Sequence, residues 1–386
     1  MEEFIKKNLD KSWQEIADLV NDKFGTTYSA NAIRNWSNRR NLHRGMAQMA
    51  RNKKPTTVEE DVALHTAKQR KTEADKKNRV YLKKIAELQR VVEEFERVTP
   101  VDSYTIKPKL GKNKGEGTVV VLASDWHIEE RVDPDTINGL NTHSLAIARQ
   151  RGDEFFQAAL RLTEILGRDV EIKDMVLALL GDFITGSIHE EMLETAEVEP
   201  ALAIIEAQRM LTSGIQFLLD NSALNLVIPC HSGNHARTTK ETRHATEAGH
   251  SYEYLMYHML ADHFRGNSRV KFIIPRSYHS FLDVYGTTIR FHHGHNIRYG
   301  GGIGGLTIPV NKAIAQWNKS RVADLDCFGH WHTRFDGGNF VANGSNIGFN
   351  AFAVSIKASF DRPSQTLFLI DKKRGKTATW PISYTV

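Results

Sequence analysis

The sequence predicts an α/β domain that is preceded by a small helical domain and a long helical linker. From about residue 118 onward, short apolar runs rich in β-branched residues alternate with helical stretches, which is the pattern of a layered α/β fold. In the first 42 residues, apolar residues recur at helical spacing. Between these regions, residues 58–97 are highly charged and contain no proline, which favours one continuous helix. The predicted domains are residues 1–45, 46–100 and 101–386.

The composition is that of a globular protein. Of the 386 residues, 40% are hydrophobic and 25% are charged, which is ordinary for soluble domains. No apolar run approaches the roughly 18 residues of a membrane span, and the N-terminal sequence lacks the apolar core of a signal peptide. Only two cysteines occur, Cys230 and Cys327, and we expect small buried residues rather than a disulfide. We therefore expect a cytoplasmic protein without a membrane partner.

The N-terminal segment resembles a helix-turn-helix. Apolar residues from Trp13 to Val20 form one helical stripe, Gly25 interrupts that helix, and hydroxyl residues up to Ser29 offer caps for a second helix. With Ile33 and Trp36 turned inward, the second helix would expose side chains that are suited to reading DNA bases. These candidates are Arg34, Asn35, Asn38, Arg39 and Arg40. The alternative is a helical bundle that docks on a protein and keeps its basic face in solvent.

The predicted linker begins basic and ends with a short apolar seam. Residues 29–57 carry seven arginines and lysines and no acidic residue, which favours a nucleic-acid partner, most simply DNA. Farther on, apolar residues from Tyr81 to Phe95 alternate at spacings of four and three, which predicts a coiled-coil seam of about two heptads. The seam in residues 81–95 would either form a homodimer or pack against the protein's own body.

In the third region, five short blocks of potential metal ligands each follow an apolar run. They are Asp125-Trp-His127, Gly181-Asp182, Gly233-Asn234-His235, His292-His293-Gly294-His295 and Gly329-His330-Trp331-His332. In layered α/β folds, ligands bind just beyond the carboxyl ends of the strands, so the five blocks are expected to converge. A convergent set of carboxylate, imidazole and amide groups predicts a site for two metal ions.

The ordered set of blocks resembles the calcineurin-like metallophosphoesterase family over about residues 118–370. The resemblance implies a two-sheet sandwich flanked by helices, with a dinuclear metal centre at one end. Carried over to matching positions, one metal is held by Asp125, His127 and His332, the other by Asn234, His293 and His330, and Asp182 bridges both. The resemblance further implies that His235 is catalytic at the leaving group and that a metal-bound hydroxide attacks the phosphorus. The mixed ligands favour two manganese ions, with iron or zinc as alternatives.

The sequence departs from the family pattern after the third block. An acidic residue that commonly braces the catalytic histidine is replaced by Ala236-Arg237. Arg237 is expected either to contact substrate phosphate or to lie at the surface. His295 is expected to contact the ligands or the substrate, and His292 is open in the same way, with plain packing as the alternative for both. The glycine-rich residues 300–305 would form a flap beside the metals or a simple connector.

Three functions are compatible with this pattern. The first is a nuclease, in which the dinuclear site hydrolyses phosphodiester bonds in DNA and the N-terminal unit holds the substrate nearby. The second is a protein phosphatase or a small-molecule phosphoesterase that uses the N-terminal unit for targeting, because the same metal chemistry serves monoesters and diesters. The third is a non-enzymatic scaffold, which the full set of ligand types disfavours. By analogy, a DNA reader joined to a phosphoesterase indicates a phage or mobile-element protein acting in a bacterial host.

Overall fold

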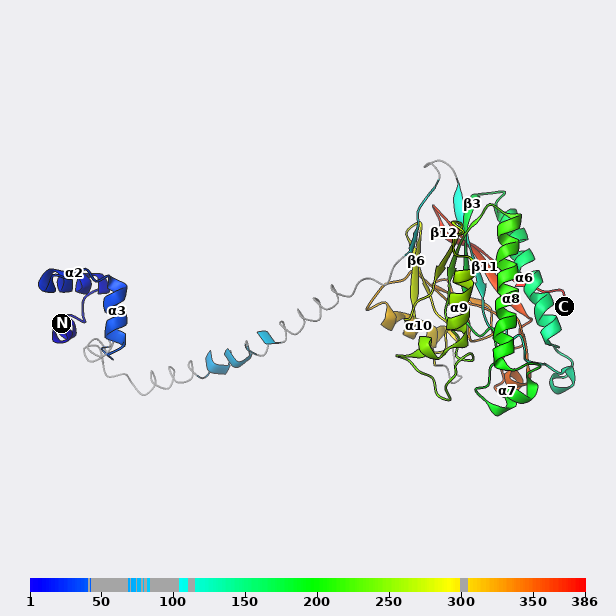
Figure 1. Cartoon of the computed structure of the whole chain (residues 1–386), viewed down its shortest axis with the longest axis horizontal. Helices are drawn as coiled ribbons and strands as arrows, with labels where there is room; N and C mark the ends of the chain where they lie inside the picture. Colours follow the sequence, from blue (N-terminus) through cyan, green and yellow to red (C-terminus); the bar gives the residue numbers. More distant parts are fainter. Residues whose placement is uncertain are drawn as a thin grey trace. The chain divides into compact units, whose positions relative to one another are not determined.

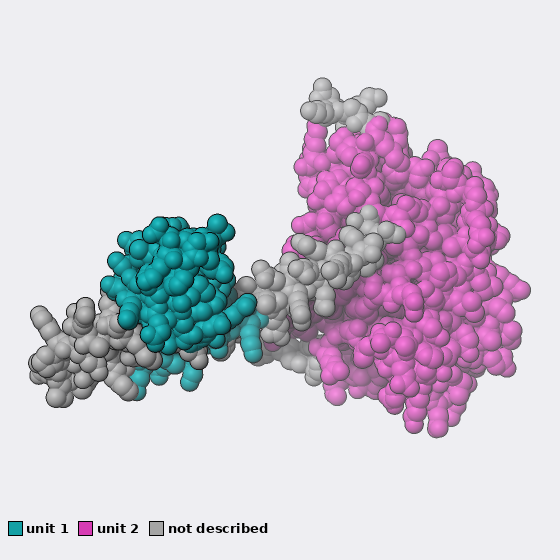
Figure 2. Space-filling view, turned by 60° about the vertical axis from the view of Figure 1, so that its left-hand side comes forward, with its two compact units in different colours: residues 1–98 teal, residues 99–386 magenta. Residues whose placement is uncertain are grey.

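A computed structural model describes most of the chain as two compact units, residues 1–98 and 99–386 (Figure 2). The described residues are 1–40, 42, 69, 71–73, 75–77, 79, 82, 83, 104–109, 115–298 and 305–386. The predicted basic linker, and most of the predicted seam in residues 81–95 and of the glycine-rich residues 300–305, lie outside them. Among the helices in the described ranges, none combines the length and apolarity that crossing a lipid bilayer requires.

Residues 1–40 of the first unit form three short helices, α1 (Glu2–Lys7), α2 (Trp13–Phe24) and α3 (Ala30–Asn38) (Figure 1). The Ser12 hydroxyl accepts the amide of Glu15 at 3.2 Å, and the Glu15 carboxylate accepts the amide of Ser12 at 2.6 Å, which fixes the start of α2. Gly25 ends α2 with a left-handed φ of 58°, and the Ser29 hydroxyl caps α3. Helices α2 and α3 therefore lie where the sequence places them.

Helix α1 is not anticipated by the sequence, because six residues offer too little periodicity to indicate a buried face. Its Ile5 is fully buried and joins Ile16, Val20 and Ile33 in one small core. The three helices thus share a single apolar interior, and the polar residues of α3 other than the buried Ser37 are left outside it.

The described residues of the second unit form two six-stranded sheets. Their strand orders are β1-β6-β7-β8-β10-β9 and β12-β11-β2-β3-β4-β5. The strands are β1 (Tyr104–Ile106), β2 (Glu116–Ala123), β3 (Glu171–Leu179), β4 (Asn225–Pro229), β5 (Val270–Ile273), β6 (Ser280–Val284), β7 (Thr287–Phe291), β8 (Leu325–Phe328), β9 (Phe335–Asp336), β10 (Phe340–Ala342), β11 (Ser364–Asp371) and β12 (Gly375–Ser383). The helices are α6 (Leu145–Leu166), α7 (Glu190–Thr195), α8 (Pro200–Asn221), α9 (Tyr252–His263), α10 (Thr307–Trp317) and α11 (Ala351–Ser355), with one-turn helices η1 (Pro134–Ile137) and η2 (Glu247–His250).

The sheets pack face to face, and helices cover their outer faces. One core cluster joins Val120 and Val176 of the second sheet to Ile289 and Cys327 of the first. On the opposite face of the second sheet, alternate residues of β2 and β3 pack under α6, α8 and α9. On the outer face of the first sheet, Phe328 packs against residues of α10. This arrangement confirms the predicted two-sheet α/β sandwich flanked by helices.

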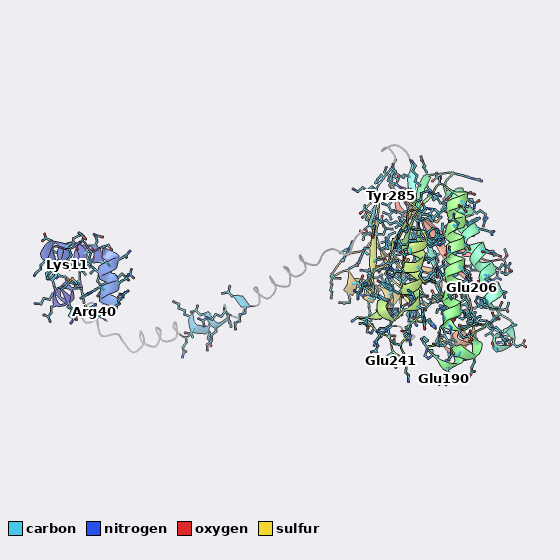
Figure 3. All side chains as sticks on the ribbon, in the orientation of Figure 1. Lys11, Arg40, Glu190, Glu206, Glu241 and Tyr285 are labelled. Atoms are coloured by element: carbon cyan, nitrogen blue, oxygen red, sulfur yellow. The ribbon has the colours of Figure 1, made fainter. Side chains whose placement is uncertain are left out.

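The sheet topology brings the five ligand blocks to one end of the sandwich. Strands β2, β3 and β4 are parallel neighbours in one sheet, and β7 and β8 are parallel neighbours in the other. Each of these strands runs directly toward one of the blocks. In Figure 3, Tyr285 marks the hairpin before β7 and Glu190 marks the start of α7 at the other end of the unit. Because β7 runs away from Tyr285, the blocks gather at the end where Glu190 lies.

Candidate metal centre

The loops that carry the ligand blocks are joined to one another by backbone hydrogen bonds. The amide of Asp125 donates to the carbonyl of Gly181 at 2.9 Å, and the amide of Gly329 donates to the carbonyl of His293 at 2.8 Å. The amide of His330 donates to both oxygens of the Asp125 carboxylate at 2.9 and 3.0 Å. These bonds join four of the five loops, and the amide of His235, which donates to Oδ1 of Asp182 at 2.8 Å, links the fifth loop to them.

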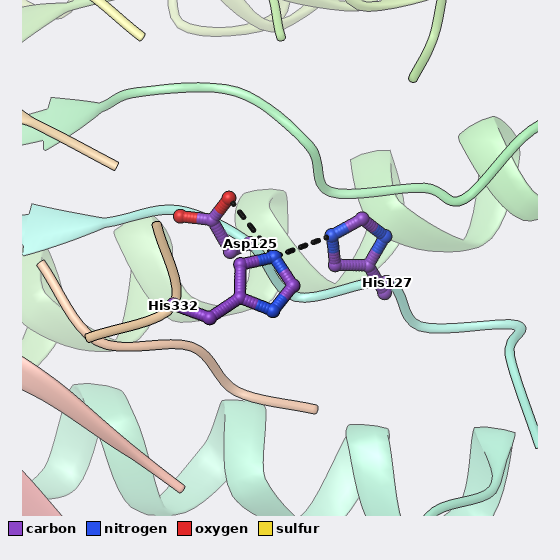
Figure 4. Close-up of side chains that lie close together, drawn as sticks. All are labelled: Asp125, His127 and His332. Atoms are coloured by element: carbon purple, nitrogen blue, oxygen red, sulfur yellow. Dashed lines mark hydrogen bonds and ion pairs between the residues drawn. The ribbon is translucent and has the colours of Figure 1, made fainter. Parts of the chain in front are cut away.

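The first group of candidate ligands consists of Asp125, His127 and His332 (Figure 4). The His332 Nε2 atom lies 3.2 Å from Nε2 of His127 and 3.5 Å from Oδ1 of Asp125. Ligand atoms about 2.0–2.1 Å from one ion lie about 2.8–3.4 Å from each other, because that range covers the edges of an octahedron and of a tetrahedron of that size. The separations in this group therefore fit one shared metal ion.

The second group consists of Asp182, His293 and His330. The His293 Nε2 atom lies 2.9 Å from Oδ2 of Asp182 and 3.2 Å from Oδ1 of Asn234. Its other ring nitrogen, Nδ1, lies 2.6 Å from the carbonyl oxygen of Leu180, which fixes the ring so that Nε2 faces the site. These separations fit a second ion, and they place the amide oxygen of Asn234 beside it.

Asp182 lies between the two groups. Its Oδ2 faces His293, while its Oδ1 accepts the backbone amide of His235 at 2.8 Å. A further set of close ligand atoms contains Asp182 together with His127 and His235. The carboxylate thus adjoins a histidine from each group, which is the position that a bridging ligand requires.

The charges at the centre favour positive ions. Burial, together with the neighbouring His235 and His332, holds the pKa of His127 well below its usual value, and burial does the same to the pKa of His330. Both rings are therefore neutral, as metal ligands must be. Burial opposes ionisation of Asp182, but His293 and His235 outweigh it and hold the pKa of Asp182 well below its usual value. Burial lowers the pKa of His293, but Asp182 outweighs it and raises that pKa to about 10, so this ring holds a proton that a bound cation would displace. The ionised, buried carboxylate of Asp182 attracts cations.

Five of the seven proposed ligands have left-handed backbone conformations. Their φ angles are 54° for Asp125, 46° for His127, 54° for Asp182, 70° for His330 and 52° for His332. Such conformations are uncommon outside glycine and gather at functional sites. The residues turn sharply just after their strands, and this turn lets side chains separated by one residue, such as His330 and His332, reach different ligand groups.

Two glycines are required by the close approach of neighbouring loops. A Cβ atom on Gly181, whose φ is 90°, would overlap the backbone of Gly233. A Cβ atom on Gly233 would in turn overlap the carboxylate of Asp182. The glycines in the Gly-Asp and Gly-Asn-His blocks therefore allow the β3 and β4 loops to lie against each other. This contact brings Asn234 and Asp182 into the same site.

His235 is oriented by a backbone carbonyl in place of the absent acidic residue. Its Nδ1 atom lies 3.0 Å from the carbonyl oxygen of Thr185. Its ring is perpendicular to that of His127, at a centroid distance of 4.8 Å. The Oε1 atom of Glu129 accepts the amides of Thr185 and Gly186, both at 2.8 Å, and so holds the segment that supplies this carbonyl.

Two buried glutamates at the site were missed in the sequence. Besides Glu129, Glu253 on α9 accepts the amide of Phe183 at 2.6 Å and the amide of Gly233 at 2.7 Å. Its carboxyl thereby joins the loops after β3 and β4. Burial and the nearby Asp182 raise the pKa of Glu253 to about 8. The only signal in the sequence is one acidic residue among the apolar residues of a helix, and that signal is common on helix surfaces.

The structure gives the other predicted site residues definite positions. The Arg237 guanidinium donates to the carbonyls of Asn234 at 2.6 Å, Thr239 at 3.1 Å and Lys240 at 3.2 Å, so it braces its own loop. The ring of His295 lies 5.5 Å from that of His293, and burial lowers the pKa of His295 to about 3. His292 is fully buried and stacks on Phe328, while Cys230 and Cys327 are buried free thiols, as predicted.

All five predicted DNA-binding residues are exposed in the first unit. Arg34, Asn35 and Asn38 lie on the open side of α3, and Arg39 follows as its C-cap. Arg40 differs from them, because its guanidinium lies over the Trp36 ring at 4.2 Å and its Nε lies 3.6 Å from Glu2. Arg40 (labelled in Figure 3) therefore has partners within the unit, whereas the other four side chains project into solvent.

Comparison with known proteins adds solved structures of low similarity. No family model matches the sequence, and no curated protein matches it. A hypothetical protein from Pyrococcus horikoshii, PH1004, is 13% identical over 69% of this chain and 88% of its own, with a TM-score of 0.36. A single mutant of Vps29 from Entamoeba histolytica is 13% identical over 69% and 99%, with a TM-score of 0.26. The sulfate thiohydrolase SoxB from Thermus thermophilus is 10% identical over 72% and 57%, with a TM-score of 0.32. The function of the site is therefore inferred from the side chains of this protein and not from these structures.

Proposed function

We propose that the protein is a calcineurin-like metallophosphoesterase that uses two metal ions to hydrolyse phosphodiester bonds in DNA. The observation that carries this proposal is the pair of ligand groups, with Asp182 between them and His235 beside them. Two ions held a few ångströms apart are suited to phosphoryl chemistry, because they can stabilise both the attacking and the leaving oxygens. Manganese fits the mixed carboxylate, imidazole and amide donors, as do iron and zinc.

When bound, the two ions would polarise the scissile phosphate and activate a water molecule for attack. Asp125, His127 and His332 would hold one ion, Asn234, His293 and His330 would hold the other, and Asp182 would contact both. In its protonated form, His235 donates Nδ1–H to the Thr185 carbonyl. Its Nε2–H is then left to give a proton to the departing oxygen, which is the role of a general acid.

The exposed α3 residues of the first unit support DNA as the substrate. Arginine and asparagine form bidentate hydrogen bonds with guanine and adenine edges, and Arg34, Asn35 and Asn38 are exposed together. A DNA-binding unit on the same chain raises the effective concentration of phosphodiester bonds at the metal centre. Dimerisation through residues 81–95 would present two such units to one duplex.

A substrate panel tests this function. The purified protein, loaded with Mn²⁺ or treated with EDTA, is assayed on single- and double-stranded DNA, RNA, bis(p-nitrophenyl) phosphate and a phosphopeptide. We expect Mn²⁺-dependent hydrolysis of DNA and of the small diester. Hydrolysis of the phosphopeptide alone would show that the protein is a phosphatase. Activity that persists in EDTA would show that the reaction does not require bound metal ions.

A further inference from the structure

Beside the metal centre lies a depression to which the proposed function has assigned no role. Its larger part has a volume of about 640 Å³ and is lined by Thr246, His250, Arg276 and Ser277 together with three small residues. A smaller pocket lined by Asn234 and Arg243, among others, also contains His250. The two pockets share His250 as a lining residue, and the smaller one, whose volume is about 10 Å³, has the proposed metal ligand Asn234 in its lining.

One wall of the depression is the loop of residues 237–250, which is fixed to the metal centre. The amide of Thr238 donates to the carbonyl of His250 at 2.8 Å, so the two ends of the loop are paired. Next to them, the amide of Tyr252 donates to the carbonyl of Ala236 at 3.0 Å. The Arg237 guanidinium ties the start of the loop to the carbonyl of Asn234. Glu241 marks this loop at the metal end of the unit in Figure 3.

The depression has unneutralised positive charge. Arg243 and Arg276 are both exposed, and within the described ranges neither guanidinium forms an ion pair or a hydrogen bond. The acidic residue in the lining is Glu247, and burial raises the pKa of its carboxyl to about 7, which weakens its negative charge at neutral pH. Arginines present planar sets of N–H donors that match phosphate oxygens. Hydroxyl groups of Thr246 and Ser277 in the lining of the larger part add further polar groups.

We propose that this depression binds the phosphodiester backbone of a nucleic-acid strand on one side of the scissile bond, with Arg243 and Arg276 as phosphate-binding residues. The proposal rests on the phosphodiesterase function and names the substrate as a chain of phosphates. A phosphomonoester or a small diester ends at the metal ions and has no group to place beside Arg276. A polynucleotide continues past the ions and meets the two free guanidinium groups.

The test compares two double variants of the full-length protein. Arg243→Ala/Arg276→Ala removes the proposed contacts, and Arg209→Ala/Arg265→Ala removes the same charge from side chains that are 74% and 77% exposed and line neither pocket. For each protein, KM is measured with a single-stranded hexanucleotide and with bis(p-nitrophenyl) phosphate. The Kd for the hexanucleotide is measured by fluorescence anisotropy in EDTA at several salt concentrations.

We expect the ratio of the hexanucleotide KM to the small-diester KM to rise about tenfold in the Arg243/Arg276 variant and to stay unchanged in the control. The slope of log Kd against log salt should become shallower by about 1.4, since each lost phosphate contact on a single strand accounts for about 0.7. An unchanged ratio and slope, or equal changes in the control variant, would overturn the proposal. If the unaltered protein fails to hydrolyse the small diester, the phosphodiesterase function is refuted, and the Kd comparison still decides the phosphate-binding role of the depression.

Discussion

Glu129 is expected to control the acid–base chemistry of His235 without touching the substrate. Its Oε1 accepts the amides of Thr185 and Gly186, both at 2.8 Å, and the carbonyl of Thr185 in turn lies 3.0 Å from Nδ1 of His235. Replacing Glu129 with alanine leaves two buried amides without an acceptor, at a cost of about 1–3 kcal/mol each in the free energy of unfolding. The loosened carbonyl then no longer fixes the tautomer and direction of the His235 ring.

The size of the kinetic effect depends on the leaving group. A general acid contributes about 10²–10⁴ to the rate when the departing oxygen needs a proton. We expect Glu129→Ala to lower kcat about a hundredfold on DNA, whose alkoxide leaving group is poor. On bis(p-nitrophenyl) phosphate, whose nitrophenolate leaves without protonation, kcat should fall no more than about threefold. Metal content, measured by atomic absorption, should not change.

Glu129→Gln is the matched control, because the amide oxygen of glutamine accepts the same two backbone N–H groups. This variant should keep both activities near those of the unaltered protein. Equal losses on the two substrates, or a loss of bound metal in Glu129→Ala, would show that Glu129 supports the ligands rather than His235, and the reasoning would be refuted.

Four further predictions address the metals, the acid, the fold and the DNA-binding unit. Asp182→Asn should abolish hydrolysis and lower the metal stoichiometry, since Asp182 adjoins both ligand groups; an unchanged stoichiometry would exclude a bridging role. His235→Ala should keep both metals and slow DNA cleavage by about two to four orders of magnitude, so a variant with retained activity would exclude His235 as the acid. Burial lowers the pKa of His143 and of His231 to about 3. The free energy of unfolding is therefore expected to fall as pH drops from about 6.5 toward 3, by about 1.4 kcal/mol per pH unit for each group. Urea unfolding in EDTA at pH 7 and 5 should show a smaller fall in this free energy for His143→Gln than for the unaltered protein. Replacing Arg34, Asn35, Asn38 and Arg39 with alanine should weaken duplex binding and flatten its salt dependence; an unaltered slope would assign α3 to another partner.

The ligand blocks were predictable because sequence order and strand direction fix them. Each block stands directly after an apolar run, and parallel neighbouring strands end at the same edge of a sheet, so Asp125 and Asp182 had to meet. The role of the neighbouring glycines came only from the structure, which shows that Gly181 and Gly233 allow two backbones to touch. The strand–helix alternation was sufficient for a layered α/β domain and for the meeting of these loops, whereas the two-sheet sandwich was implied by the family resemblance.

The supporting residues were not predictable, because their roles arise only from tertiary contacts. Glu253 lies 18 residues after His235 on a helix, and nothing local shows that its carboxyl receives amides from two loops. The partner of His235 is a backbone carbonyl, that of Thr185, and a carbonyl has no signature in a sequence. Arg237 could be identified as a residue near the site, but only coordinates show that three carbonyls occupy its guanidinium.

The left-handed backbone conformations of five proposed ligands lower the stability of the fold while they direct the ligand side chains into the site. A non-glycine residue in this conformation costs about 1–3 kcal/mol, and five such residues converge within a few ångströms. A glycine in place of His332 would remove the cost of this conformation at that position, because glycine adopts a positive φ without strain. It would also remove a proposed metal-binding nitrogen. The proposed metal ions would offset part of this backbone cost, because a cation that binds only the folded chain stabilises it.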